Sequence, residues 1–279
     1  MAKKGAEKKL SLGLKASGMM RHVGIDLRRT LFKEILQALG GNLRIIVCGG
    51  AAMNPELMNQ FDDFGISVMQ GYGITECAPL ISCCPTNWRK YNSVGLPVKG
   101  LEVKIEPDDG SLSSDGYEIG EILVRGANVM LGYYKDPTTT AEAIDSDGWF
   151  RTGDYGYQDS DGFLFITGRK KNVIVLNNGK NVFPEEIESY IENISLIKEC
   201  VVVGRGDSQT ITVTAVIYPD FEEAEKQQLT ELSDIADAIK KKIAEINKTL
   251  PTFKQIRGIE MRKVEFEKTT TKKIKRKNV

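Results

Sequence analysis

The sequence is poor in the residues that bind transition metals, and it lacks the long apolar runs that cross membranes. It contains one histidine, His22, and its five cysteines show no C-x-x-C spacing. This excludes a structural zinc site built on paired cysteines. Because no apolar leader or bilayer-length apolar stretch occurs, we expect a cytoplasmic protein without a transmembrane segment; peripheral contact with a membrane stays open.

The chain also has no net charge, because its 38 lysines and arginines balance its 38 aspartates and glutamates. A chain without an overall positive field has no general attraction for nucleic acid, and its basic end, Lys268 to Lys277, has no interleaved aromatic residues. We therefore expect no nucleic-acid partner. With 279 residues, 41% hydrophobic and 27% charged, the composition is that of a globular protein of one large or two ordinary domains.

Apolar periodicity in the first third predicts a β-α-β unit. The expected elements are a helix over 31–39, a buried strand over 43–48, an amphipathic helix over 54–64 and a strand over 66–70. In a parallel sheet both strands end at the same edge, which places Gly49 and Gly50 beside Gly71-Tyr72-Gly73. Ligands of open α/β sheets bind at that edge.

The segment Gly71 to Glu76, GYGITE, resembles a dinucleotide fingerprint only in part. Glu76 replaces the third glycine, and a carboxylate there would repel a pyrophosphate. With Mg²⁺ between them, Glu76 becomes a ligand that bridges to a phosphate, while the Thr75 hydroxyl donates to a phosphate oxygen and Tyr72 stacks on a base. An ordinary glycine-rich loop with a surface glutamate explains the motif equally well.

From about residue 87 to 168 the pattern changes to short strands, which predicts a small barrel or sheet. The clearest strands are Leu101 to Ile105 and Ile119 to Val124, separated by turns at Asp108 to Gly110 and Ser114 to Gly116.

Asp154 closes the motif GWFRTGD. An aspartate after Thr-Gly can be held in a turn with both oxygens projecting, which suits the two vicinal hydroxyls of a ribose. An aspartate that only stabilises its own turn is the alternative.

Two strand-like runs, over 163–167 and 173–176, flank a polar connection with three adjacent cations, Arg169, Lys170 and Lys171. Such a cluster requires anions. The following loop, Asn177 to Asn181, favours positive φ and close approach of a ligand. The remaining pattern of helices and strands predicts a compact α+β domain that ends in a tail which, by composition, is solvated and basic.

Five ordered motifs then carry a family resemblance: GGAAMNP (49–55), QGYGITE (70–76), GWFRTGD (148–154), GRKKNVIVLNNGKNVFPEEIE (168–188) and KTTTKKIKR (268–276). Together they resemble the adenylate-forming acyl-CoA synthetases, and most closely the long-chain fatty acyl-CoA ligases. The resemblance implies an α/β plus α+β fold. Residues 1–168 are then the C-terminal part of a large AMP-binding domain, with a partial parallel sheet over 1–86 and a β-barrel-like subdomain over 87–168. Residues 169–279 form a mobile lid domain with its hinge near 169–172.

The resemblance also implies a reaction. A fatty acid attacks the α-phosphate of ATP to give acyl-AMP, and the thiol of coenzyme A then displaces AMP. The nucleotide-binding residues implied are Gly49, Gly50, Ala51, Gly71, Tyr72, Gly73, Thr75, Asp154, Arg169 and Lys273. Within this set Thr75 contacts the α-phosphate, Glu76 holds Mg²⁺, and Asp154 clasps the ribose with help from Arg169.

Three further roles come from the resemblance alone. Lys273 aligns with the catalytic lysine that neutralises charge in the first step. Lys171 matches the hinge about which the lid domain rotates between the two steps. Gly179 and Lys180 lie at the coenzyme A channel.

The chain departs from the family in several places. The Ser/Thr/Gly-rich phosphate loop is absent, and family members are roughly twice this long, so we expect a C-terminal half that is inactive alone. Lys272 stands where the family has glycine, and Asn172 where it has aspartate. Transfer of the acyl group to a carrier protein, or a non-catalytic nucleotide-binding module, are the alternative functions.

Overall fold

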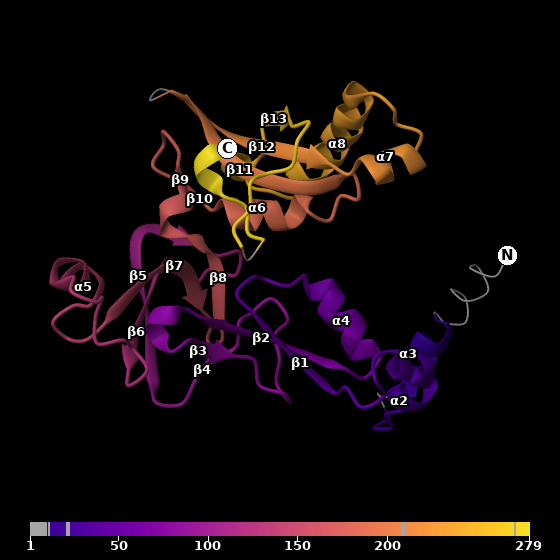
Figure 1. The fold of residues 1–279 in the computed structure, drawn as a ribbon, viewed down its shortest axis with the longest axis horizontal. Coiled ribbons are helices and arrows are strands. Elements are labelled where there is room, and N and C mark those ends of the chain that lie inside the picture. The colour runs from indigo at the N-terminus through magenta and orange to yellow at the C-terminus, as the bar shows by residue number, and fades with distance from the viewer. Residues whose placement is uncertain (1–9, 11, 21–22, 208–209, 271) are drawn as a thin grey trace. The chain divides into compact units, whose positions relative to one another are not determined.

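The computed structural model describes residues 10, 12–20, 23–207, 210–270 and 272–279. The basic segment over 1–9 lies outside the described residues, and so does Thr271 in the last of the five motifs, KTTTKKIKR (268–276), called the closing motif below. The chain divides into two compact units (Figure 1). The first comprises residues 1–104, 123–152 and 158–165, and the second residues 105–122, 153–157 and 166–279. No helix in the described part of the chain is long and apolar enough to cross a membrane.

The first unit contains the β-α-β crossover that the sequence predicted. Its helices and strands are α2 (Arg28–Leu31), α3 (Lys33–Ala38), β1 (Ile45–Gly49), α4 (Pro55–Asp63), β2 (Ser67–Gly73), η1 (Thr75–Cys77), β3 (Leu80–Cys83), β4 (Leu96–Pro97) and α5 (Pro137–Ala143). Strands β1 and β2 are parallel, and the sheet order is β1-β2-β3-β4. Asn54 begins α4, because its side chain accepts a hydrogen bond from the Glu56 N–H at 2.7 Å.

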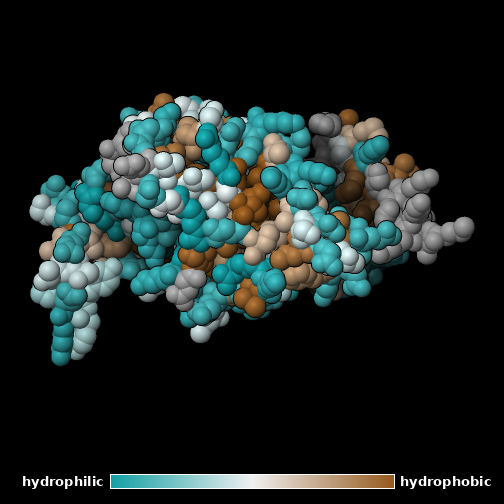
Figure 2. Space-filling view, turned by 90° about the horizontal axis from the view of Figure 1, so that it is seen from above, coloured by the Kyte–Doolittle hydropathy of each residue, from teal (hydrophilic) through white to brown (hydrophobic). Residues whose placement is uncertain are grey.

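Two expectations for this unit are wrong. The helix expected over 31–39 is divided at Phe32 into α2 and α3. The strand expected to be buried, β1, alternates instead: Ile45 is 47% exposed and Val47 is 62% exposed. One row of its apolar side chains, which includes Ile45 and Val47, therefore stays uncovered on one face of the sheet. Figure 2 shows hydrophobic residues reaching the surface in several places.

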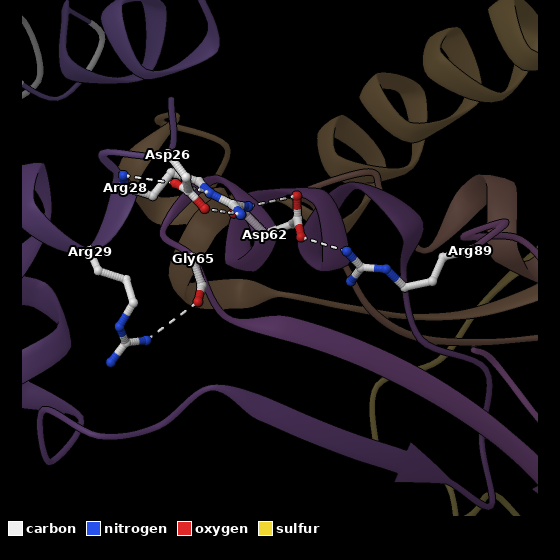
Figure 3. A network of polar contacts seen from close by, with 6 residues as sticks. All are labelled: Asp26, Arg28, Arg29, Asp62, Gly65 and Arg89. Carbon is white, nitrogen blue, oxygen red and sulfur yellow. Dashed lines mark hydrogen bonds and ion pairs between the residues drawn. The ribbon is translucent and has the colours of Figure 1, made fainter. Parts of the chain in front are cut away.

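A buried carboxylate on α4 holds this crossover together (Figure 3). Asp62 is 5% exposed. It forms ion pairs with Arg28 at 3.1 Å and with Arg89 at 2.9 Å. Arg29 meanwhile donates to the carbonyl oxygen of Leu43, just before β1, at 2.9 Å. These contacts hold α4 and the residues just before β1 in place. The ends of β1 and β2 that carry the glycines are therefore held as well.

The central β-region is a four-stranded sheet of order β5-β6-β7-β8. Its strands are β5 (Leu101–Leu112), β6 (Glu118–Gly126), β7 (Phe150–Gln158) and β8 (Leu164–Arg169). The turn expected at Ser114 to Gly116 is present, but the one expected at Asp108 to Gly110 is not, because β5 continues through it. Of the two expected forms, barrel or sheet, the structure has the sheet.

The second unit contains the compact α+β domain. Its remaining elements are η2 (Lys170–Asn172), β9 (Ile174–Val175), β10 (Asn181–Val182), α6 (Pro184–Ile191), β11 (Ile197–Asp207), β12 (Thr210–Pro219), α7 (Phe221–Lys226), α8 (Leu232–Asn247), η3 (Thr252–Lys254), β13 (Gly258–Met261) and η4 (Arg276–Asn278). The sheet order is β11-β12-β13, with the first pair antiparallel and the second parallel. Helices α6 and α8 pack on this sheet through a shared apolar core that includes Ile187, Val202, Ile217 and Ile239.

Candidate functional site

The two glycine segments lie side by side, as the sequence predicted. Gly49 at the end of β1 pairs with Gly71 in β2. A Cβ atom on Gly49 would lie 3.0 Å from the carbonyl oxygen of Gly71, and a Cβ atom on Gly73 would lie 1.8 Å from that of Pro79. Close approach of neighbouring backbone therefore requires glycine at these positions, and Gly50 follows with φ +82°.

The other two residues expected at the nucleotide pocket differ in exposure. Ala51 is exposed just after β1, whereas Tyr72 is 9% exposed and belongs to the core. Little of the tyrosine ring is therefore left for stacking on a base.

Thr75 and Glu76 form a tight 3₁₀ turn, η1, directly after β2. Ala78 ends the turn in a left-handed conformation with φ 54°, and the Ile74 N–H donates to the Pro79 carbonyl oxygen at 2.8 Å. Thr75 is exposed and Glu76 is half-buried. The turn thus holds a hydroxyl and a carboxylate at the end of β2.

Asp154 lies within β7, so the turn expected around it is absent. The preceding residue, Gly153, has φ +69°, a left-handed conformation inside the strand. Asp154 is 5% exposed, and the Nε of Arg169 lies 2.7 Å from its Oδ1. The guanidinium offsets the cost of burying the carboxylate, which keeps a charged acceptor in place.

Glu121 on β6 supports this pair, although the sequence did not single it out. It is 4% exposed. It accepts the Gly153 N–H at 3.2 Å and forms an ion pair with Lys170 at 2.7 Å. Glu121 therefore contacts the residue before Asp154 and the residue after Arg169. An acid inside the apolar run of β6 was the sequence signal for this role.

Of the three adjacent cations, Arg169 and Lys170 form ion pairs with carboxylates of the protein. Lys171 is exposed and has no ion partner in the described part of the chain. Its neighbour Asn172 donates from its side-chain amide to the Glu185 Oε1 at 2.5 Å. The family's aspartate at this position would face the glutamate carboxylate, so asparagine turns a repulsion into a hydrogen bond.

Gly179 forms the tip of the β9–β10 hairpin. Its φ is +76°, its N–H donates to the Leu176 carbonyl oxygen at 2.8 Å, and an added Cβ would meet nothing within 4 Å. The Lys180 ammonium lies 4.5 Å from the centre of the Phe253 ring. The glycine is thus required by the turn, and the space beside it is open.

The closing motif is a short hairpin and not a free tail. The Thr269 N–H donates to the Lys273 carbonyl oxygen at 2.8 Å, and Lys268 pairs with Ile274. Ile274 packs on an apolar cluster that β11 and β12 contribute to, while Lys273 is exposed. Lys272 has φ +62°, in the left-handed region where the family's glycine would be unstrained.

Arg276 anchors this hairpin. Its Nη2 lies 2.5 Å from the Glu188 Oε2 and 3.5 Å from the Glu185 Oε1, and its Nη1 donates to the Val202 carbonyl oxygen at 3.3 Å. Glu188 also accepts the Val202 N–H at 2.6 Å. Burial raises the pKa of Glu188, against the opposing effects of Arg276 and the Val202 N–H. Nothing in the sequence indicated that Arg276 would meet Glu188.

The expected site residues fall into two groups. The first unit carries the glycine segments with Thr75 and Glu76, and the second carries Asp154, Arg169 and Lys273. Within each unit the structure brings together the residues described above.

Glu76 fits a magnesium ion as a single protein ligand. Its Oε1 accepts the Tyr133 hydroxyl at 3.3 Å, and its Oε2 has no hydrogen-bond partner in the described part of the chain. No cluster of three metal-binding side chains occurs among the described residues. Mg²⁺ commonly binds one or two carboxylates and takes its remaining ligands from substrate phosphates and water, so the donor set is suitable.

Comparison with known proteins decides the family. Residues 7–134 match the AMP-binding enzyme family, and residues 171–279 match the AMP-binding enzyme C-terminal domain. A long-chain-fatty-acid–CoA ligase, FadD15 of Mycobacterium bovis, is 34% identical over 275 residues, which cover 93% of this chain. The chain belongs to the adenylate-forming acyl-CoA synthetases. The resemblance carried by the five motifs is thereby confirmed.

This acyl-CoA synthetase chain spans 43% of the length of the Mycobacterium bovis ligase. A long-chain-fatty-acid–CoA ligase of Haemophilus influenzae is 40% identical over 164 residues, 58% of this chain and 29% of that protein. Among solved structures, o-succinylbenzoate CoA synthetase from Bacillus subtilis with its acyl-adenylate intermediate matches with TM-score 0.69 and 26% identity, over 88% of this chain and 48% of that one. The fold expected from the resemblance, a partial adenylate-forming ligase fold, is thus confirmed.

Proposed function

We propose that this chain works as part of a ligase that activates a long-chain fatty acid with ATP and transfers it to coenzyme A. The observation that carries the proposal is Asp154, a buried carboxylate paired with Arg169. Held by Arg169 and shielded from water, this carboxylate is a fixed acceptor that suits the two hydroxyls of a ribose. Relatives that are 34% and 40% identical and named long-chain-fatty-acid–CoA ligases support the substrate class.

In the first step the fatty acid carboxylate attacks the α-phosphate of ATP, acyl-AMP forms and pyrophosphate leaves. Asp154 accepts the ribose hydroxyls, and Arg169 fixes its orientation. Thr75 donates its hydroxyl to an α-phosphate oxygen. Lys273, exposed on an anchored hairpin, neutralises charge between carboxylate and phosphate. Glu76 would hold Mg²⁺, which when bound neutralises phosphate charge.

In the second step the thiol of coenzyme A attacks the acyl carbonyl carbon, and the bond to AMP breaks. Gly179 leaves room beside the β9–β10 turn for the pantetheine arm, and Lys180 lies next to it as a cation for the phosphates. Lys171, exposed between two paired neighbours, is the residue about which the lid domain, residues 169–279, turns between the steps.

An aromatic acid is the second candidate for the substrate. The 2-succinylbenzoate–CoA ligase of Bacillus pumilus is 36% identical over 190 residues, and the anthranilate CoA ligase AuaEII bound to anthranoyl-AMP matches with TM-score 0.67. A carrier protein in place of free coenzyme A would use the same thiol chemistry, because both present a pantetheine arm.

AMP binding tests the nucleotide site directly. We expect Asp154→Asn to weaken AMP binding about tenfold or more, since a charge-assisted hydrogen bond contributes about 1.5–3 kcal/mol. Asp237→Asn is the matched control, because Asp237 is exposed on α8. Equal affinity of the two variants, measured by isothermal titration calorimetry, would refute the ribose role.

The reaction is tested by ATP–pyrophosphate exchange. The chain is assayed with and without a complementing N-terminal fragment of a long-chain ligase, using fatty, succinylbenzoic and anthranilic acids in parallel. Exchange that depends on a long-chain fatty acid supports the proposal. Exchange with only an aromatic acid would replace the substrate, and AMP binding without exchange in any mixture would favour a non-catalytic nucleotide-binding module.

A further inference from the structure

Residues 128–133, to which the proposed function assigns no role, form hydrogen bonds with the turn that carries Glu76. The Asn128 side-chain amide donates to the carbonyl oxygens of Cys77 and Leu80, each at 2.9 Å. The Met130 N–H donates to the carbonyl oxygen of Glu76 itself at 2.8 Å. Three hydrogen bonds from one short segment thus fix the backbone on which the Glu76 carboxylate stands.

The same segment also reaches the Glu76 carboxylate. The Tyr133 hydroxyl donates to Oε1 at 3.3 Å and leaves Oε2 without a hydrogen-bond partner in the described part of the chain. A phenolic hydroxyl is protonated at neutral pH, so Tyr133 acts as the donor to this carboxylate. A carboxylate held through one oxygen presents the other in a defined direction.

Tyr133 is itself held in place. Its backbone N–H donates to the Thr140 Oγ1 at 2.9 Å, and Asp136 caps α5 by accepting the Thr139 N–H at 3.0 Å. A Cβ on Gly132 would lie 2.8 Å from the Thr140 Cγ2, so only glycine lets the segment pass this closely over α5. Tyr133 is 36% exposed, and its backbone is held by an ordered element.

We propose that Tyr133 is a positioning residue that orients the Glu76 carboxylate toward a divalent cation bound with the nucleotide. The inference rests on the proposed function and deepens it, because it adds the support that Glu76 needs to act as a metal ligand. Removal of the Tyr133 hydroxyl frees the carboxylate to rotate, and the cation then loses affinity before the nucleotide does. Loss of such an outer hydrogen bond commonly weakens metal binding about tenfold or more.

Binding of Mn²⁺, a paramagnetic substitute for Mg²⁺, tests the proposal on the chain as it exists. The free ion is measured by electron paramagnetic resonance in the presence of AMP. We expect Tyr133→Phe to weaken Mn²⁺ binding about tenfold and Glu76→Gln to abolish it. Tyr134→Phe is the matched control, since the neighbouring ring is 87% exposed, and it should leave Mn²⁺ binding unchanged.

Unchanged Mn²⁺ affinity in Tyr133→Phe, with Glu76→Gln defective, would overturn the inference. Absence of Mn²⁺ binding by the unaltered chain would overturn it as well. AMP affinity measured in the same samples without metal separates these results from the proposed function, because that affinity depends on Asp154. Circular dichroism of each variant shows whether the fold is kept.

Discussion

The anchor of the closing hairpin gives the sharpest prediction. Arg276→Met removes the guanidinium and keeps an unbranched apolar side chain of similar reach. The variant loses the 2.5 Å contact with Glu188, the 3.5 Å contact with Glu185 and the hydrogen bond to the Val202 carbonyl oxygen. Glu188 keeps only the Val202 N–H as a donor among the partners described.

The burial of the Glu188 and Arg276 side chains determines how much free energy of unfolding the variant loses. The Glu188 side chain is 9% exposed and that of Arg276 is 25% exposed. Removing one partner of a fully buried pair costs about 3–5 kcal/mol, and an exposed pair contributes about 0–1 kcal/mol. This pair lies between the two limits, so we expect a loss of about 2–3 kcal/mol in the free energy of unfolding near neutral pH.

The loss should depend on pH. The pKa of Glu188 is already raised by burial in the folded chain, and Arg276 opposes that rise, so the variant's pKa rises further. A folded carboxyl with a raised pKa binds a proton more tightly than its unfolded form. Its contribution to stability therefore falls as pH rises from the unfolded value of about 4.3 through the folded value. The cost of Arg276→Met is smallest at acid pH and grows toward neutral pH.

Urea unfolding followed by far-ultraviolet circular dichroism measures this cost at about pH 5 and about pH 8. The control is Arg205→Met, whose partner Glu260 lies at 2.9 Å with both side chains exposed, at 41% and 46%. We expect the control to lose about 0–1 kcal/mol. A loss for Arg276→Met no larger than that of the control, or one that does not change with pH, would refute the reasoning.

Three further outcomes are expected. Gly73→Ala should lose at least about 2 kcal/mol in tryptophan-monitored unfolding, since its Cβ would lie 1.8 Å from the Pro79 carbonyl oxygen, whereas Gly18→Ala, with open space around it, should not. Lys272→Gly relieves a φ of +62° and should raise the melting temperature; a lower value would contradict the strain. Gly179→Leu should slow thioester formation from supplied acyl-AMP while sparing pyrophosphate exchange in the complemented enzyme, and equal loss of both would exclude its assignment to the coenzyme A step.

Sequence periodicity predicted the elements that depend on local pattern. The β-α-β crossover followed from two apolar runs with glycines at their ends. It failed where burial or pairing depends on distant chain. The apolar run of β1 does not show that one of its faces is uncovered, and the Asp108 to Gly110 turn signal was overridden by strand pairing in β5.

The sequence by itself predicted the β-α-β crossover and the family, and it proposed the site residues, because apolar periods and motif order act over short distances. Only the tertiary structure decided the partners. Arg169 meets Asp154, Tyr133 meets Glu76 and Arg276 meets Glu188 through folding that joins distant segments. The residue type fixes the charge and the hydrogen-bonding groups of a side chain. The direction and distance between two side chains are set only when strands and helices pack.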